Sequence, residues 1–317
     1  MHVPSLPSGQ PCLISGMRMV FPWPVALMTP DAGGPALAEV SVREGRLAMP
    51  SGDGWRAIGM GMWVKGAAVL ATMATVGRFL IEADERVAGG AGIRVTADLD
   101  RDADPLILSQ AMAGHLMGAI LHLSGVLPMH ACCMARNGVA VAFMASRSGG
   151  KSTLAAALHG RGWRPVADDL TALTVGDGGA MLAWPGPSRW RLSQASLAAV
   201  GLTADADMAL GPTGKWLVPG GPGWQVGPVP LAAIAELAFG EERPMRVERL
   251  TSARAVAMLH SHVFRRRLIP ALALKHAVAG RCLAAGSRLA AYTVTRPPDL
   301  SRLDEMAEAV ERLEIDA

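Results

Sequence analysis

The segment "FMASRSGGKSTLAAAL", Phe143 to Leu158, limits the fold more than any other part of the chain. An apolar run leads into it and an alanine-rich run at helical spacing leaves it, so we predict a strand, a glycine-rich turn and a helix in that order. Such a turn lets successive backbone N–H groups converge on an anion at a helix N-terminus, which adds partial positive charge. The segment therefore predicts phosphate binding in an α/β fold.

Individual residues of this segment have distinct expected roles. Lys151 completes the charge match to phosphate, and the hydroxyl of Ser152 is placed to bind Mg²⁺. Ala145 stands where the leading glycine of such a loop is expected, which costs about 1 kcal/mol only if that position needs a positive φ. We therefore predict a site for a nucleotide with Mg²⁺. The residues expected to bind the nucleotide are Ser148, Gly149, Gly150, Lys151, Ser152 and Thr153.

Two adjacent carboxylates, Asp168 and Asp169, follow the strand that is expected after the helix. A right-handed β-α-β crossover places the C-terminal ends of its parallel strands on one edge of the sheet, so this pair should emerge beside the loop. There, one carboxylate would bind Mg²⁺ and the other would accept a proton from an incoming hydroxyl. A solvated turn or a helix cap is the alternative for such a pair.

A hairpin is predicted directly before the loop, because an Asn-Gly pair at 137–138 joins two apolar runs. With this pair as the turn, Arg136 faces Val139, and the register carries His130 opposite Ala145. His130 would then lie at the mouth of the loop, within reach of a phosphate oxygen. A structural histidine is the alternative.

By composition, the chain divides into a β-rich N-terminal region, residues 1–104, and an α/β domain, residues 105–317. In the first region, polar and apolar residues alternate around Glu44-Gly45, which predicts a hairpin. In the second, the pattern predicts strands and helices in alternation, which is typical of an α/β domain. Helices are expected at 105–124, 251–264, 270–285 and 300–313, and strands at 234–239 and 288–295.

Half of the 317 residues are hydrophobic, so a membrane span has to be considered. The longest uncharged run, 105–135, contains histidines and serines that are costly in lipid, and we predict a buried helix there. The net charge of +3 is too small to favour nucleic acid or an anionic membrane as a partner. The N-terminal residues lack the features of a signal peptide, so we expect a cytoplasmic protein. The four cysteines lack metal-ligand spacing and are expected to be small buried residues.

The stretch from Met129 to Leu173, which contains this histidine, loop and aspartate pair, resembles the HPr kinase/phosphorylase family. The resemblance implies an α/β fold with the P-loop kinase core that HPr kinases share with phosphoenolpyruvate carboxykinases. It also implies that ATP binds to the loop through Lys151 and that an aspartate activates a serine hydroxyl. Asp168 is the preferred general base and Asp169 the preferred Mg²⁺ ligand, with the reverse assignment left open.

The chain lacks an "EVTAGRN"-like motif, so phosphorylase activity and HPr as the substrate do not follow. Its opening "CLISGMRMVFPWPVAL" and its "GKWLVP" look instead like HPr-kinase-related proteins of peptide-modification systems. Among these are lasso-peptide tailoring kinases, which phosphorylate the C-terminal serine of a precursor peptide. The resemblance thus implies a peptide partner, and it leaves a homo-oligomer open. Lys215 matches a recurrent lysine that would cover the phosphates; a solvated loop lysine is the alternative.

Other functions remain open from the sequence. A nucleotide-binding module that regulates a partner without chemistry would tolerate a decayed loop, although the retained Lys151 and aspartates argue against decay. An HPr-type protein serine kinase is the second alternative. A metabolite kinase or a carboxykinase-like enzyme is weaker, and an ABC-type ATPase is weaker still because no "LSGGQ"-like signature is present.

Overall fold

The computed structural model describes residues 5–52, 54–84, 92–240 and 245–315, and the chain forms two compact units. The first unit comprises residues 1–128 and 265–278, and the second comprises 129–264 and 279–317. This division differs from the expected boundary at 104/105, because the helical segment that follows residue 104 packs on the strands of the first unit.

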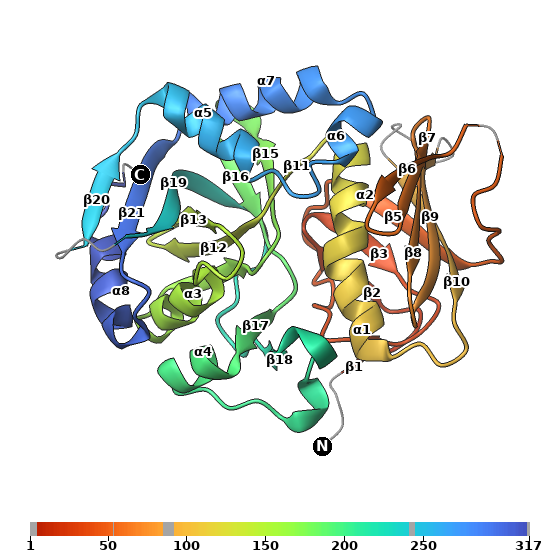
Figure 1. The fold of residues 1–317 in the computed structure, drawn as a ribbon, viewed down its shortest axis with the longest axis horizontal. Helices are drawn as coiled ribbons and strands as arrows, with labels where there is room; N and C mark the ends of the chain where they lie inside the picture. Colours follow the sequence, from red (N-terminus) through yellow and green to blue (C-terminus); the bar gives the residue numbers. More distant parts are fainter. Residues whose placement is uncertain (1–4, 53, 85–91, 241–244, 316–317) are drawn as a thin grey trace. The chain divides into compact units, whose positions relative to one another are not determined.

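The first unit contains an eight-stranded sheet in the order β2-β3-β5-β10-β9-β8-β7-β6 and a two-stranded ribbon of β1 and β4 (Figure 1). The β-rich character predicted for this region is confirmed. The hairpin predicted at Glu44-Gly45 is wrong, since β5 ends at Glu44 and pairs in parallel with β3 and β10. The strands are β1 (Ser5–Leu6), β2 (Pro11–Ile14), β3 (Met17–Val20), β4 (Val25–Ala26), β5 (Ala38–Glu44), β6 (Arg56–Gly59), β7 (Met62–Lys65), β8 (Ala68–Met73), β9 (Gly77–Asp84) and β10 (Gly92–Leu99).

A continuous helical segment follows, made of α1 (Pro105–Gln110), the π-helical turn η1 (Ala111–Leu116) and α2 (Met117–Leu123). Asp104 caps it, because its carboxylate accepts from the first free backbone N–H groups of α1. The segment is long and apolar enough to cross a membrane, but 78% of its most apolar window is buried. It is a buried helix, as the polar residues within it predicted.

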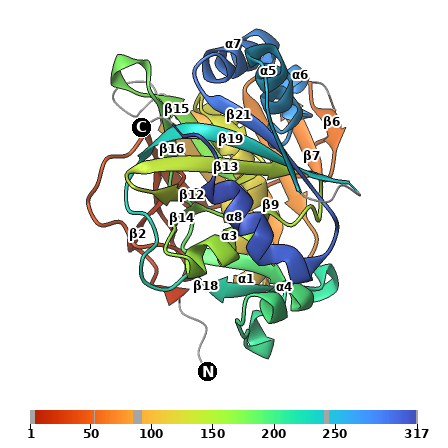
Figure 2. The ribbon, with the colours of Figure 1, turned by 90° about the vertical axis from the view of Figure 1, so that its left-hand side faces the viewer.

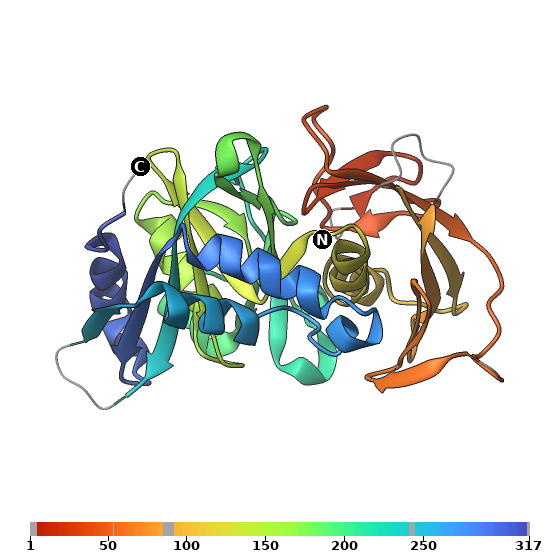
Figure 3. The ribbon, with the colours of Figure 1, turned by 90° about the horizontal axis from the view of Figure 1, so that it is seen from above.

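The second unit is built on a mixed sheet in the order β15-β16-β19-β13-β12-β14, with β21 also paired to β19 and β20 paired to β21. Helices α3 and α8 lie on one face, and α5 and the adjoining end of α7 lie on the other (Figures 2 and 3). The strands are β11 (Leu127–Met129), whose first two residues belong to the first unit, β12 (Ala131–Arg136), β13 (Val139–Ala145), β14 (Arg164–Ala167), β15 (Thr171–Val175), β16 (Met181–Trp184), β17 (Arg189–Ser193), β18 (Lys215–Pro219), β19 (Val229–Phe239), β20 (Arg246–Arg249) and β21 (Ala290–Arg296). The helices are α3 (Lys151–Gly160), α4 (Gln194–Ala199), α5 (Ser252–Ser261), α6 (Leu268–Ala271), α7 (Lys275–Gly286) and α8 (Leu303–Glu311), with α6 in the first unit.

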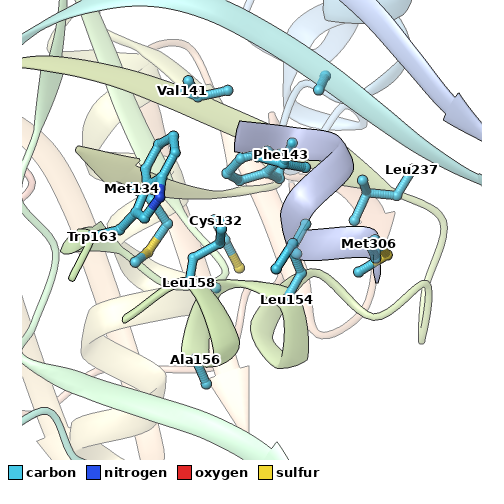
Figure 4. Close-up of a cluster of buried hydrophobic side chains, with 14 of the residues drawn as sticks. Cys132, Met134, Val141, Phe143, Leu154, Ala156, Leu158, Trp163, Leu237 and Met306 are labelled. Carbon is cyan, nitrogen blue, oxygen red and sulfur yellow. The ribbon is translucent and has the colours of Figure 1, made fainter. Parts of the chain in front are cut away.

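A fully buried apolar core holds α3 against the sheet (Figure 4). Alternate residues of β13, among them Val141 and Phe143, point toward Leu154 and Leu158 of α3 and Met306 of α8. Each such side chain contributes about 1.5–3 kcal/mol through burial, so the start of α3 is fixed relative to the end of β13.

The predicted hairpin and crossover are both present. Arg136 lies opposite Val139 in the β12–β13 pair, as the Asn-Gly turn predicted. Strand β14 pairs antiparallel with β12, which itself runs antiparallel to β13, so β14 and β13 point the same way with β12 between them. The ends of β13 and β14 therefore lie on one edge of the sheet, and α3 connects the two strands.

Candidate functional site

The glycine-rich loop runs from the end of β13 at Ala145 to the start of α3 at Lys151. Two of its residues take the left-handed conformation, Ser148 with a φ of 62° and Gly150 with a φ of 81°. Ala145 does not. The missing leading glycine therefore introduces no backbone strain, since alanine is costly only at a positive φ.

Gly149 is required in this loop for a different reason. Its backbone N–H donates to the carbonyl of Ser146 at 3.0 Å, which closes a tight turn. A Cβ at this position would lie 2.5 Å from the Cβ of Ala145 and 2.9 Å from the Ser146 carbonyl oxygen. The methyl group of Ala145 thus leaves room for glycine only at position 149.

Lys151 is buried, and its ammonium group is linked to His130. The Nζ atom donates to the carbonyl of Ala145 at 3.2 Å and lies 3.2 Å from His130 Nε2. Since an ammonium group only donates, Nε2 accepts and Nδ1 carries the proton, which points to the Asp169 carbonyl at 3.2 Å. Burial lowers the pKa of His130, against an opposing effect of Asp169. His130 is therefore a neutral bridge between Lys151 and Asp169.

The carboxylate of Asp168 accepts from three donors. Its Oδ1 accepts from the Ser152 hydroxyl at 2.7 Å and from the Cys132 thiol at 2.8 Å. Its Oδ2 accepts from the backbone N–H of Arg191 at 2.8 Å. Burial and the neighbouring Asp168 raise the pKa of Cys132, so the thiol keeps its proton and donates.

Ser152 and Asp168 supply the oxygen pair that fits Mg²⁺. Neighbouring ligands of an octahedral Mg²⁺ lie roughly 3 Å apart, and the ion usually takes one or two protein oxygens with phosphate and water completing its shell. The separation of the Ser152 and Asp168 oxygens, 2.7 Å, suits that arrangement. Among the described residues, no group of three or more His, Cys, Asp and Glu side chains could hold a metal ion.

Asp169 has a left-handed backbone, with a φ of 72°. Its Oδ1 accepts from the Arg191 guanidinium at 3.1 Å and lies 3.5 Å from His130 Nδ1. Its Oδ2 has no hydrogen-bond partner among the described residues. Asp168 therefore contacts Ser152, and Asp169 contacts Arg191 and His130; which carboxylate binds the metal and which accepts the proton stays a prediction.

A two-stranded ribbon of β17 and β18 carries three cations toward the aspartates. Arg189 and Arg191 share one face of β17, and Lys215 opposite Ser193 extends that face. Burial lowers the pKa of Lys215, and burial together with Arg191 lowers the pKa of Arg189 to about 10. The other face packs Trp190 into the core beneath α3.

The two arginines were missed from the sequence. The alternation in "RWRLS" indicates a strand with one charged face, but the surrounding stretch is rich in proline and glycine, which is typical of loops and obscures that signal. Lys215 does lie near the aspartates and Lys151, whose charges act on it. It is half-buried rather than a solvated loop residue.

Thr153, one of the residues expected to bind the nucleotide, has a buried hydroxyl that shares a hydrogen bond with Ser196 at 2.7 Å, which ties α3 to α4. All four cysteines are free and buried, as predicted.

No family model and no curated protein matches this chain. Among solved structures, the chain is similar to the HPr(Ser) kinase/phosphatase from Coxiella burnetii, with a TM-score of 0.32 and 14% sequence identity. The similarity covers 59% of this chain and 97% of the other. At this identity and score, the comparison assigns neither a family nor an activity to the chain.

Proposed function

We propose that this protein is an ATP- and Mg²⁺-dependent kinase that transfers the γ-phosphate to a serine hydroxyl of a peptide. The observation that carries the proposal is the convergence of Lys151, Ser152, Asp168 and Asp169 at one edge of a sheet. The acceptor we propose, the C-terminal serine of a lasso-peptide precursor, rests on the sequence resemblance.

The charge around the loop supports a polyphosphate ligand. The cations around the loop outnumber the two carboxylates of the site, Asp168 and Asp169. ATP carries the complementary negative charge, and such a match attracts and holds phosphates. The cations are Lys151, Arg189, Arg191, Lys215 and Arg296.

The loop and the start of α3 would bind the phosphates. The first backbone N–H groups of a helix have no intrahelical acceptor, and here they follow a turn shaped by Ser148 and Gly150. Lys151 would donate to phosphate oxygens from beneath the loop, while Ser152 and Asp168 would hold Mg²⁺. When bound, Mg²⁺ neutralises charge on the phosphate oxygens.

Asp169 would take the proton of the acceptor hydroxyl. As the serine oxygen forms its bond to the γ-phosphorus, the bond from that phosphorus to the β-phosphate oxygen breaks, and ADP leaves with the electron pair. Asp169 Oδ2 receives the proton, while the Arg191 guanidinium holds the carboxylate at 3.1 Å and His130 donates to the backbone carbonyl of Asp169 at 3.2 Å. Proton transfer of this kind contributes about 10²–10⁴-fold to the rate.

The direct test is incubation of the protein with ATP, Mg²⁺ and peptides that end in serine. We expect a mass gain of one phosphate or a multiple of it, mapped to the terminal serine by fragmentation. Peptides that end in alanine serve as the matched control, and HPr serves as the alternative acceptor. Turnover of ATP to water alone, with every hydroxyl-bearing acceptor offered, would contradict the proposal.

Substitution of the aspartates separates a kinase from a nucleotide-binding module. We expect Asp169→Asn to bind ATP as the wild type does and to lose transfer by about 10²-fold or more. Asp168→Asn should weaken the Mg²⁺ dependence of ATP binding. A module that acts without chemistry would keep its ATP-dependent partner binding in both variants.

A further inference from the structure

Arg296, the last residue of β21, lies directly beneath the glycine-rich loop. One guanidinium nitrogen donates to the Gly149 carbonyl at 3.0 Å and another to the Pro297 carbonyl at 3.2 Å. The guanidinium carbon lies 4.8 Å from the centroid of the Phe239 ring. The side chain is 5% exposed, and its Nε has no hydrogen-bond partner in the part of the chain that the structure describes.

No carboxylate compensates this buried charge among the described residues: Arg296 forms no ion pair, and burial alone lowers its pKa. A buried guanidinium without a counter-charge is strongly unfavourable. The positive end of α3 lies beside it, and a Cβ on Gly150 at the start of that helix would collide with the guanidinium. Two positive groups thus adjoin each other where one anion would stabilise both.

Hydrogen bonding to two carbonyls does not account for a permanent charge at this place, since a neutral amide could satisfy the same acceptors. Arg189, which is also buried, does have compensation because it lies near both aspartates. The loop that Arg296 supports leads directly to Lys151, and the same guanidinium lines a small cavity with Gly150 and Thr153. The uncompensated charge therefore lies against the carbonyl side of the loop whose N–H groups would face the proposed phosphates.

We propose that Arg296 is a positioning residue for the nucleotide, whose buried charge is completed by the polyphosphate that the loop binds. It would act through the Gly149 carbonyl, which it holds beneath the loop so that the neighbouring N–H groups face the ligand. The inference rests on the proposed binding of ATP to this loop. It adds Arg296, a residue outside the loop, to those on which ATP binding depends.

Two substitutions separate the charge from the hydrogen bonds. Arg296→Lys keeps the charge, and Arg296→Gln keeps a donor for Gly149 but is neutral. We expect the Kd for ATP, measured by calorimetry, to rise about ten-fold in Arg296→Gln and only a few-fold in Arg296→Lys. The salt dependence of ATP binding should weaken in Arg296→Gln alone, because one charge is lost.

The matched control is Arg302→Met. Arg302 lines the same cavity but is paired with Glu305, so its loss should leave the Kd within about two-fold of the wild type. A folded Arg296→Gln variant with wild-type affinity and salt dependence would overturn the inference. So would equal losses in the lysine and glutamine variants, which would indicate a structural role.

If Arg296→Gln does not fold, Lys151→Met provides the second measurement. With the loop lysine removed, inorganic tripolyphosphate should still raise the melting temperature through Arg296 and the start of α3; no rise would contradict the inference. Wild-type protein that binds ATP but transfers no phosphate would contradict the kinase proposal and leave this inference intact. Phosphate transfer by the wild type, together with normal ATP binding by Arg296→Gln, would support the kinase proposal and contradict this inference.

Discussion

Asp168 and Asp169 are neighbours in the chain, yet their carboxylates meet different groups. The left-handed φ of 72° at Asp169 turns its side chain toward His130 and Arg191, while Asp168 stays against Ser152. Non-glycine residues adopt this conformation at a cost, and aspartate is among those that tolerate it best. One backbone angle therefore gives the two adjacent carboxylates different partners.

The pH dependence of transfer should reflect His130. Burial lowers the pKa of His130, so the neutral ring is present at neutral pH and is lost only as the pH falls below the ordinary histidine value of about 6.5. Protonation would place two like charges together at His130 and Lys151. We expect the transfer rate to fall on the acid side of this value, and His130→Gln to remove that part of the pH–rate profile. An unchanged profile would assign His130 a structural role only.

Cys132 should stabilise the Asp168 carboxylate rather than take part in chemistry. Replacing Cys132 by alanine removes a donor to a buried carboxylate, which costs about 1–3 kcal/mol, or a drop of several degrees in melting temperature. Cys132→Ser retains a donor and should recover part of this loss. ATP affinity should change little in either variant. If the alanine variant is as stable as the wild type, the thiol–carboxylate contact contributes nothing.

At the scale of elements, the glycine-rich loop accommodates the methyl group of Ala145 because position 149 has no side chain. Because a Cβ at Gly149 would lie 2.5 Å from that of Ala145, Gly149→Ala should distort the loop at a cost of about 1–3 kcal/mol and weaken ATP binding accordingly. Ala145→Gly removes the opposing methyl group. The double variant should therefore recover part of the affinity, as measured by calorimetry. Purely additive losses would show that the two positions are not coupled.

The β17–β18 ribbon is the element that brings cations to the aspartates. Arg191 contacts Asp168 through its backbone N–H and Asp169 through its guanidinium. Replacing the side chain therefore removes the contact with Asp169 and keeps the backbone contact with Asp168. We expect Arg191→Met to lower kcat about 10²-fold with a smaller effect on the Kd for ATP. Arg164→Met, at an exposed position of β14, is the control. Equal activity of the two variants would exclude Arg191 from the site.

The sequence predicted those parts of the fold and site that depend on local geometry. Its predictions failed where pairing between strands that are distant in the sequence decides the structure. The Asn-Gly turn fixed the register of β12 and β13, and the crossover placed the aspartates beside the loop. The split between Asp168 and Asp169 depends on one φ, which no pattern encodes. The hairpin expected at Glu44-Gly45 failed because β5 pairs in parallel with strands before and after it, a choice set by packing of the whole sheet.

At the scale of the whole molecule, the units are not continuous in sequence. The chain leaves the second unit after residue 264, contributes residues 265–278 to the first, and returns. In the first unit, Leu268 and Ile269 of α6 are buried, and the Arg56 guanidinium donates to the Ala271 carbonyl at 2.9 Å. The proposed kinase site lies wholly in the second unit, but that unit does not correspond to one uninterrupted stretch of chain.

This topology predicts that the second unit is not stable when the first is simply deleted. Removal of residues 1–128 would expose Leu268 and Ile269, whose burial is worth about 1.5–3 kcal/mol each, and leave an apolar helix in solvent. We expect a protein of residues 129–317 to aggregate, as measured by light scattering. Leu268→Ser and Ile269→Ser together should restore a monodisperse protein that still binds ATP, because no site residue is changed. Aggregation that persists in the double variant would mean that the second unit depends on the first through more than the segment 265–278.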